Sequence, residues 1–404
     1  MKRTFRTWLA AFLLVSVLAG CAQSKAKEEK DFISLAYVAL HMVGMDQMTP
    51  EEVPAYLDTW RWEGITDICI IGETFCAGKD GTLCTEWNRE EWPEVFEGLD
   101  YKGDPIREDK QREILCPKPV LKAVVDYFKQ KDMKMWVSVK ASGWLTGGSF
   151  GEVIVDDMKL RKYTASVCDF AREFGFDGID FDWEFPTSPE TGEGYRNMMR
   201  LCREAGFEVS VCAIQPNNAA DYSDDCLPGK VSGTTAGRFM KWDEIVNEVV
   251  ADRINVMQYL AFNEQTHLMD LDLKGEKMAA WETTYPAEFT DDRKVDFLCG
   301  VGFYSWVLPQ KRSKGQGKSM NFTRMYEEYG EEAYTSRLVG GKNAVWTTDD
   351  VRKIVRMAKD RGWSGVFTWL VTHDFDKSHP DSVSRQFALS QEVQAIWNEE
   401  NTTK

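Results

Sequence analysis

Eight short apolar segments, separated by helical ones, constrain the fold of this chain more than any other feature. They are rich in β-branched and aromatic residues, as buried strands are, and lie at residues 32–40, 65–72, 133–141, 176–185, 207–214, 253–261, 295–304 and 364–371. Amphipathic stretches such as KPVLKAVVDYFKQKD and TDDVRKIVRMAKDRG fall between them. Repeated strand–helix units predict a parallel sheet, and eight units favour a closed (β/α)8 TIM barrel of the α/β class over an open sheet.

The connections after strands 2, 5 and 7 are long, so we expect extended loops on the face of the barrel where substrates bind. The loop at 73–116 carries Trp87 and Trp92, and the loop at 305–346 carries Trp306. Each tryptophan could stack on a ligand or could pin its own loop, and the sequence leaves both roles open.

The start of the chain differs from the barrel that follows. A basic head precedes an apolar run from Trp8 to Leu18 and the sequence LAGC, an order that resembles a bacterial lipoprotein signal peptide at 1–20. A lipidated Cys21 and a polar tether would then occupy 21–30. A transmembrane anchor is the alternative, but the apolar run is shorter than the roughly 20 residues that a span needs. We expect 31–404 to form one barrel, lipid-anchored to the bacterial cell envelope outside the cytoplasm.

Charge and cysteine content argue against several kinds of ligand. The formal net charge of −16 argues against a nucleic-acid partner, and the 15 tryptophans suit a neutral ligand that stacks on aromatic rings, such as a sugar. The ten cysteines show no paired CxxC spacing and the four histidines are scattered, so we expect no metal site and no cofactor. Five cysteines fall in apolar segments, where they are most simply core residues, whereas Cys76 and Cys84 flank a loop and could form a disulfide.

Three acids interrupt the fourth predicted strand, in the sequence FGFDGIDFDWEFP at residues 174–186. Side chains alternate between the faces of a strand, so Asp180, Asp182 and Glu184 share one face. A buried carboxylate must be paired, hydrogen-bonded or protonated, so the row marks a ligand site unless the strand belongs to an antiparallel sheet with a solvated face. In a parallel barrel, Asp182 and Glu184 would emerge at the carboxyl end of the strand, where active sites lie.

The spacing Asp177-x-x-Asp180-x-Asp182-x-Glu184 resembles the D-x-x-D-x-D-x-E signature of glycoside hydrolase family 18, the chitinases and their relatives. INVMQY, GVGFY and GVFTW in the last three predicted strands resemble further motifs of that family. The resemblance implies hydrolysis of β-1,4 linkages next to N-acetylglucosamine, in chitin or chito-oligosaccharides, with retained configuration and the acetamido group of the substrate as nucleophile. The expected partner is such a glycan, and we expect a monomer.

Carried over by position, the resemblance implies roles for four catalytic residues. Glu184 would be the general acid and base, and Asp182 would orient the acetamido group. Asp180 would tune Asp182, with which it would share a proton, and Tyr259 would hydrogen-bond the acetamido carbonyl. The resemblance also implies three substrate-binding residues: Met257, Tyr304 and Trp369. Of these, Trp369 would form the floor of the sugar pocket. It implies a structural role for Asp177.

Two positions depart from the family pattern. Leu260 stands where chitinases usually have Asp, which leaves the exact glycan open. SVKASGW replaces the usual S-x-G-G in the third strand and puts Lys140 on the inward face, where it could steady the acids or reach water.

Other functions remain as alternatives. An endo-β-N-acetylglucosaminidase acting on the chitobiose core of N-glycans would use the same mechanism. A non-catalytic chitinase-like lectin would share the fold but would not need the proton donor Glu184. A barrel that uses the acids to bind a metal is the weakest alternative, because no His or Cys stands beside them.

Overall fold

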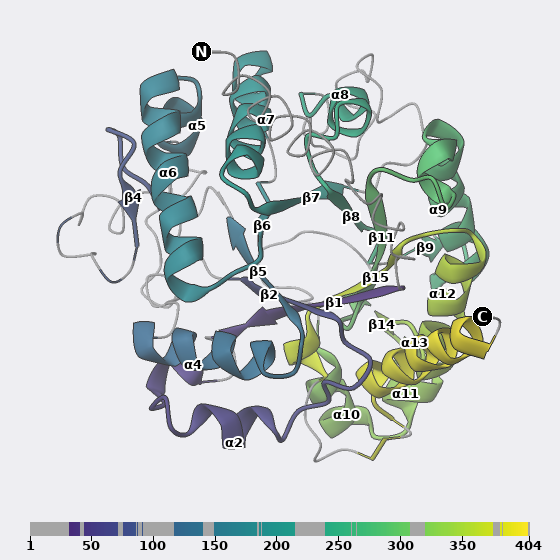
Figure 1. The fold of residues 1–404 in the computed structure, drawn as a ribbon. Coiled ribbons are helices and arrows are strands. Elements are labelled where there is room, and N and C mark those ends of the chain that lie inside the picture. The colour runs from purple at the N-terminus through teal and green to yellow at the C-terminus, as the bar shows by residue number, and fades with distance from the viewer. Residues whose placement is uncertain are drawn as a thin grey trace, which may run out of the picture. The chain divides into compact units, whose positions relative to one another are not determined.

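Eight parallel strands close into a barrel in the order β1-β15-β11-β8-β7-β6-β5-β2, and the first strand pairs with the last. In chain order they are β1 (Ile33–Ala39), β2 (Asp67–Ile71), β5 (Lys134–Val139), β6 (Gly178–Phe181), β7 (Glu208–Ile214), β8 (Arg253–Met257), β11 (Asp296–Gly302) and β15 (Gly365–Trp369). Each lies within one of the eight segments that the sequence predicts. The (β/α)8 TIM barrel is therefore confirmed (Figure 1).

The computed structural model describes residues 32–402 apart from 41–43, 72–75, 86, 88–90, 92–116, 140–148, 184–185, 187, 215–238, 260, 264, 308–319, 375–379 and 382. The predicted signal peptide, Cys21 and the tether lie outside the described residues. In the part that is described, no helix combines the length and the apolar character that crossing a membrane requires.

Helices cover the outside of the barrel (Figure 1). They are α2 (Val53–Leu57), α4 (Lys118–Lys129), α5 (Ser149–Ile154), α6 (Asp157–Phe174), α7 (Pro189–Glu204), α8 (Trp242–Asn247), α9 (Leu271–Thr284), α12 (Thr348–Asp360) and α13 (Arg385–Thr402). Helix α6 shows how local sequence sets the bounds. The Asp156 carboxylate accepts hydrogen bonds from the backbone N–H groups of Met158 and Lys159, and Gly175 ends the helix at a φ of 85°, which glycine adopts without strain.

Short additional elements lie in three connections. A hairpin follows β2, another follows β8, and a three-stranded sheet with two helices follows β11. They are β3 (Cys76–Ala77), β4 (Leu83–Cys84), β9 (Phe262–Asn263), β10 (Leu268–Met269), β12 (Trp306–Val307), α10 (Phe322–Tyr329), α11 (Glu332–Thr335), β13 (Leu338–Val339) and β14 (Asn343–Ala344). Most of the long connection after the fifth barrel strand, β7, lies outside the described residues.

One of two open questions about the loop after β2 is decided by the structure. The Trp87 ring stacks on Phe170 of α6, with centroids 5.7 Å apart and planes 15° apart, and it also packs against Phe174. Trp87 therefore pins its own loop to an outer helix and is not a ligand platform. Cys84 stands opposite Cys76 in the hairpin register and is buried, with its Sγ donating to Thr82 O at 3.7 Å. The side chain of Cys76 lies outside the described part of the chain, so a disulfide between the two stays a prediction.

A buried ion pair closes the amino-terminal part of the barrel interior. Arg253 Nη1 lies 2.9 Å from Asp67 Oδ1, and Trp136 Nε1 donates to the same oxygen at 2.8 Å. The guanidinium lies over the Trp136 ring, 4.5 Å from its centroid. Gly178 leaves room for this ring, because a Cβ at that position would come within 2.2 Å of Trp136 Cε3. The interior beyond this layer, toward the carboxyl ends of the strands, holds Asp180 and Asp182.

Candidate active site

The carboxylate of Asp180 is fully buried inside the barrel and is held by side chains from both neighbouring strands. Ser138 on β5 and Ser210 on β7 stand directly opposite Asp180 in the strand register. Ser138 Oγ donates to Oδ2 at 2.9 Å, and Ser210 Oγ donates to Oδ1. Asn255 Nδ2 on β8 donates to Oδ1 at 3.2 Å. Asp180 is thus a fixed part of the barrel interior.

Tyr37 joins this network from β1, which does not pair with β6. Asn255 Nδ2 donates to Tyr37 Oη at 2.8 Å, and the same hydroxyl lies 3.3 Å from Cys212 Sγ. Burial raises the pKa of Asp180, and hydrogen bonds from Ser210, Ser138, Tyr37 and Asn255 oppose that rise. Burial also raises the pKa values of Tyr37 and Cys212 well above their usual range. These neighbours therefore stay protonated near neutral pH and can donate to a carboxylate.

Asp182 lies two residues further along the same inward face and is 2% exposed. Its backbone N–H donates to Val139 O at 3.3 Å, which continues the parallel pairing beyond the end of β6. The next backbone N–H, of Trp183, donates to Tyr195 Oη on α7 at 3.0 Å. The Trp183 ring packs edge-on against Tyr195 and against Phe150 on α5. Two outer helices therefore fix the chain where it leaves β6.

Aromatic rings line the same interior near the carboxyl ends of β1, β8 and β15. The Tyr259 ring centroid is 6.0 Å from that of Trp369 and 5.6 Å from that of Phe367. Trp369 lies 5.5 Å from Tyr37, which links this cluster to the Asp180 network. Met257 packs into the same interior cluster. The structure thus brings three predicted site residues together: Met257, Tyr259 and Trp369.

Tyr304, the fourth predicted aromatic or apolar site residue, extends this cluster beyond the end of β11. Its ring centroid is 6.2 Å from that of Tyr259, with the planes 67° apart. A Cβ at Gly302 would come within 2.9 Å of Tyr304 Cε1 and 3.0 Å of Tyr259 Cβ, and one at Gly300 within 3.1 Å of Tyr259 Cδ1. The two glycines of GVGFY therefore make room for the rings of two tyrosines.

A buried lysine fixes the backbone beside Tyr259. Lys274 on α9 is fully buried, and its Nζ donates to the carbonyl oxygens of Gln258 and Gly300, the latter at 2.7 Å. Burial lowers the pKa of Lys274. Trp346 Nε1 donates to the carbonyl oxygen of Tyr259 at 2.8 Å. These bonds hold the end of β8 against β11 and so set where the Tyr259 ring stands.

Asp177 stands at the amino end of β6, away from the site. Its Oδ2 accepts a hydrogen bond from the backbone N–H of Met135 at 2.8 Å, and its Oδ1 accepts one from Lys129 Nζ. These two bonds connect β6 to β5 and to α4. This position agrees with a structural role for Asp177.

Some predicted residues lie outside the described part of the chain, and the structure assigns them no position. They are Cys21, Trp92, Lys140, Glu184, Leu260 and the side chain of Trp306.

Reasoning from sequence assigned no role to the residues that hold Asp180: Tyr37, Ser138, Ser210 and Asn255. The signal was present, because each is a hydrogen-bonding residue at an inward position of an otherwise apolar strand. Two strands show this signal most clearly. In EVSVCAI the polar Ser210 stands between two valines, and in RINVM the polar Asn255 stands between an isoleucine and a valine. Which of these reach one acid depends on the register of strands far apart in sequence.

The arrangement suits a neutral ligand with hydroxyl or amide groups and apolar faces. Carboxylates at the carboxyl end of β6 can accept hydrogen bonds and stabilise positive charge, and the aromatic rings can stack on a sugar. Among the residues that the structure describes, no group of three or more His, Cys, Asp and Glu side chains is arranged to hold a metal ion.

Comparison with known proteins agrees with this chemistry. A family model described as "Glycosyl hydrolases family 18" matches residues 98–374, more than half of the chain. The sporulation-specific chitinase 2 of Saccharomyces cerevisiae is 37% identical over 73 residues, which cover 18% of this chain and 14% of the yeast protein. The chain thus spans a small part of the length of this curated relative.

Solved structures share the fold over nearly the whole chain. A chitinase from Bacteroides thetaiotaomicron has a TM-score of 0.60 at 15% identity, with 90% of this chain and 96% of that chain covered. The Bacillus megaterium spore cortex-lytic enzyme has a TM-score of 0.58 at 13% identity, with 91% and 75% covered. At such low identity the likeness concerns the fold.

Proposed function

Because the chain belongs to glycosyl hydrolase family 18, we propose that it hydrolyses β-1,4 linkages next to N-acetylglucosamine, in chitin or chito-oligosaccharides. The observation that carries the proposal is the pair of buried carboxylates on the inward face of the chain, Asp180 on β6 and Asp182 just beyond its end. Burying a carboxylate costs free energy, so carboxylates inside a barrel are found mainly where the charge takes part in binding or catalysis. The cluster of Tyr259, Trp369 and Met257 in the same interior supplies the apolar surface that a sugar ring needs.

In the proposed mechanism the substrate supplies its own nucleophile. Glu184 protonates the oxygen of the leaving sugar while the acetamido oxygen attacks the anomeric carbon, which forms an oxazolinium ion. Asp182 orients the acetamido group and stabilises the positive charge that develops, and Tyr259 donates a hydrogen bond to its carbonyl. Glu184 then takes a proton from the water that opens the ring. Two displacements at the same carbon retain the configuration.

The hydrogen bonds around Asp180 support the proposed role of Asp182 in orienting the acetamido group. Four neutral donors hold Asp180 rigidly, and its charge lies on the same face as that of Asp182. Two carboxyl groups so placed favour the uptake of one shared proton. In the proposed reaction that proton moves as charge develops on the acetamido group.

Product analysis on a panel of glycans tests the proposal. The full chain is incubated with β-linked chitin oligomers, a high-mannose glycoprotein and spore-cortex glycan, and first products are followed by rapid NMR. We expect cleavage of the chitin oligomers with initial release of the β-anomer, and inhibition by a thiazoline analogue of N-acetylglucosamine. Cleavage of the glycoprotein alone would indicate an endo-β-N-acetylglucosaminidase. Initial release of the α-anomer would contradict the mechanism, and binding without cleavage would indicate a lectin.

We also propose that the chain is a lipoprotein, anchored through Cys21 to the cell envelope. The support is the sequence LAGC after a short apolar run with a basic head. Cys21→Ser should move the protein from the membrane fraction to the soluble fraction, whereas Cys84→Ser should leave it in the membrane fraction. A Cys21→Ser protein that remains membrane-bound would contradict the lipid anchor.

A further inference from the structure

Two free thiols face each other between helices α6 and α7, outside the barrel interior. Cys168 Sγ on α6 lies 3.8 Å from Cys202 Sγ on α7, and the two side chains are 2% and 0% exposed. A disulfide bond is about 2.0 Å long, so a small rotation of the two side chains and a slight approach of the helices would close it. The site proposed above uses neither thiol.

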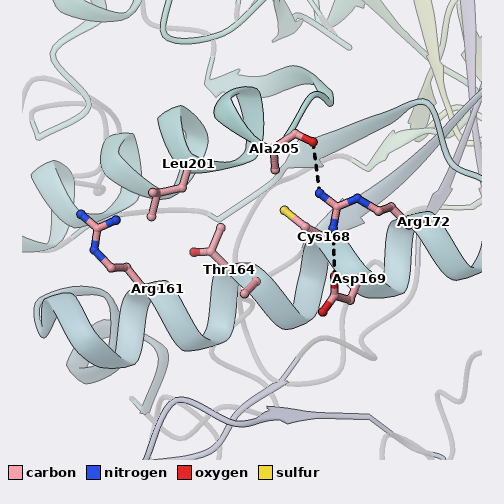
Figure 2. A pocket seen from close by; sticks show the side chains of 8 residues that line it. Arg161, Thr164, Cys168, Asp169, Arg172, Leu201 and Ala205 are labelled. Carbon is pink, nitrogen blue, oxygen red and sulfur yellow. Dashed lines mark hydrogen bonds and ion pairs between the residues drawn. The ribbon is translucent and has the colours of Figure 1, made fainter.

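A hollow gives solutes a way to this pair. It has a volume of about 280 Å³ and is lined by residues of both helices, among them Cys168, Leu201 and Ala205. Figure 2 shows the Cys168 side chain pointing from its helix toward the other, with Arg161 and Arg172 on either side. A reagent that enters the hollow therefore meets Cys168 before it meets Cys202, which is completely buried.

The surroundings make Cys168 the better nucleophile of the two. The Cys202 thiol and, to a smaller extent, the Arg172 guanidinium lower the pKa of Cys168 against the effect of burial. The Cys168 sulfur and burial raise the pKa of Cys202. Arg172 is itself held in place, because Nη1 donates to Asp169 Oδ1 at 2.9 Å and Nη2 donates to Ala205 O at 3.1 Å. Thiolates attack disulfides and thiols do not, so reaction should begin at Cys168.

We propose that Cys168 and Cys202 form a redox pair, which closes a disulfide between α6 and α7 when the protein meets a small anionic disulfide. The Cys168 thiolate attacks one sulfur of the reagent, whose S–S bond breaks and releases one thiolate. Cys202 then loses its proton to solvent and attacks Cys168 Sγ, and the second reagent thiolate leaves. Two protein thiols are oxidised and one reagent disulfide is reduced to two thiols. Arg161 and Arg172 line the hollow, and each is paired with one carboxylate, Arg161 with Asp157 and Arg172 with Asp169. A guanidinium has five N–H donors, so those left over can bind the carboxylates of the reagent.

The cross-link would enclose the segment that carries the acid row. The chain between Cys168 and Cys202 contains β6, with Asp180 and Asp182. A disulfide restricts the unfolded chain more than the folded one, so its formation should raise the melting temperature by a few degrees. Because Cys168 and Cys202 already lie side by side, the bond should form in the folded protein.

Oxidised glutathione is the probe for the test. The folded full chain is treated with it and its intact mass is measured. Free thiols are then blocked, and the protein is examined by non-reducing peptide mapping. We expect a peptide that links Cys168 to Cys202, a mass loss of about 2 Da for the loss of two hydrogens, and a melting temperature that returns to its starting value after reduction. Cys84→Ser is the matched control, since it makes the same substitution at a buried cysteine outside this pair and should leave the cross-link unchanged.

Two variants separate the steps. Cys202→Ser should stop at a glutathione adduct on Cys168, and Cys168→Ser should show neither adduct nor cross-link on this pair. Absence of the cross-link in the folded wild-type chain, or a stable adduct on Cys168 that Cys202 does not resolve, would overturn the proposal. A glutathione adduct that forms first on Cys202 would also overturn it. None of these readouts uses a glycan, so the result is independent of the proposed hydrolase activity.

Discussion

Ser210 on β7 donates a hydrogen bond to the buried carboxylate of Asp180 on β6, from the position directly opposite in the strand register. Ser138 does the same from β5, on the other side of Asp180. Three adjacent barrel strands thus meet at one carboxylate. Its position is set by the sheet itself and does not depend on a loop.

The first prediction concerns the hydrogen bond from Ser210 to Asp180. Ser210→Ala removes a donor from a buried carboxylate, so the variant should lose about 1–3 kcal/mol of unfolding free energy in urea. The Ser210 hydrogen bond opposes the rise in the pKa of Asp180, so its loss should raise that pKa further. Ser166→Ala on the outside of α6 removes a hydroxyl that bonds only to its own helix and is the control, with an expected change within about 0.5 kcal/mol. Equal effects in the two variants would show that the Ser210 hydroxyl does not support Asp180.

A second prediction concerns the proton donor. Glu184→Gln keeps the size of the side chain and removes the transferable proton, so turnover of chitin oligomers should fall by a factor on the order of 10² to 10⁴ while binding persists. Glu193→Gln, on the exposed face of α7, makes the same chemical change and should leave turnover unaltered. Turnover and binding by calorimetry are measured together. Full activity of the Glu184→Gln protein would exclude Glu184 as the donor.

The third prediction uses two glycines. Gly178→Ala would place a Cβ 2.2 Å from Trp136 Cε3, inside the layer that closes the barrel, and should destabilise the protein by about 1–3 kcal/mol or more. Gly151→Ala in α5 would meet nothing nearer than 3.9 Å and should be neutral or slightly stabilising, because alanine favours a helix. The melting temperatures of the two variants, compared with that of the wild type, test this prediction. A Gly178→Ala protein as stable as wild type would mean that Trp136 moves aside without cost.

A fourth prediction concerns pH. Asp374 is 1% exposed, and burial raises its pKa to about 7, although the backbone N–H of Gln386 and the charge of Arg385 oppose the rise. The folded protein then holds this proton more tightly than the unfolded chain does. The contribution to stability is therefore full below about pH 4 and is lost as pH rises to about 7, a loss on the order of 4 kcal/mol.

Asp374→Asn should remove the fall in unfolding free energy between about pH 4 and 7. Unfolding in urea at several pH values in that range measures it. Burial lowers the pKa of the neighbouring His373 to about 4, which gives a slope of opposite sign between about pH 4 and 6.5. The difference between wild type and variant cancels the histidine. A difference curve that does not change with pH would contradict the raised pKa of Asp374.

Several features of the site could be predicted from short stretches of sequence. The alternation of side chains along a strand predicted that Asp180 and Asp182 share the inward face, and both are buried there. The motifs INVMQY and GVFTW placed Met257, Tyr259 and Trp369 at the carboxyl ends of two strands, where the structure brings them together. The prediction for the acids rests on the period of a strand, which is a local property. The prediction for Met257, Tyr259 and Trp369 rests on the resemblance of these motifs to those of glycoside hydrolase family 18.

Other features were out of reach of local reasoning. The donors that hold Asp180 come from positions 42, 30 and 75 residues away, and Tyr37 reaches it from the first strand. Trp87 packs on α6, although its sequence surroundings fit a ligand platform equally well.

The sequence by itself determined the eight strands, the closed parallel barrel and the inward direction of Asp180 and Asp182, because backbone geometry and the burial of apolar residues act over a few residues at a time. Only the tertiary structure decided which hydroxyl meets which carboxylate, and that Cys168 lies beside Cys202. Those contacts depend on the register of paired strands and on the packing of helices whose residues are distant in the chain. No local pattern encodes that register, since it is set by the closure of the whole barrel.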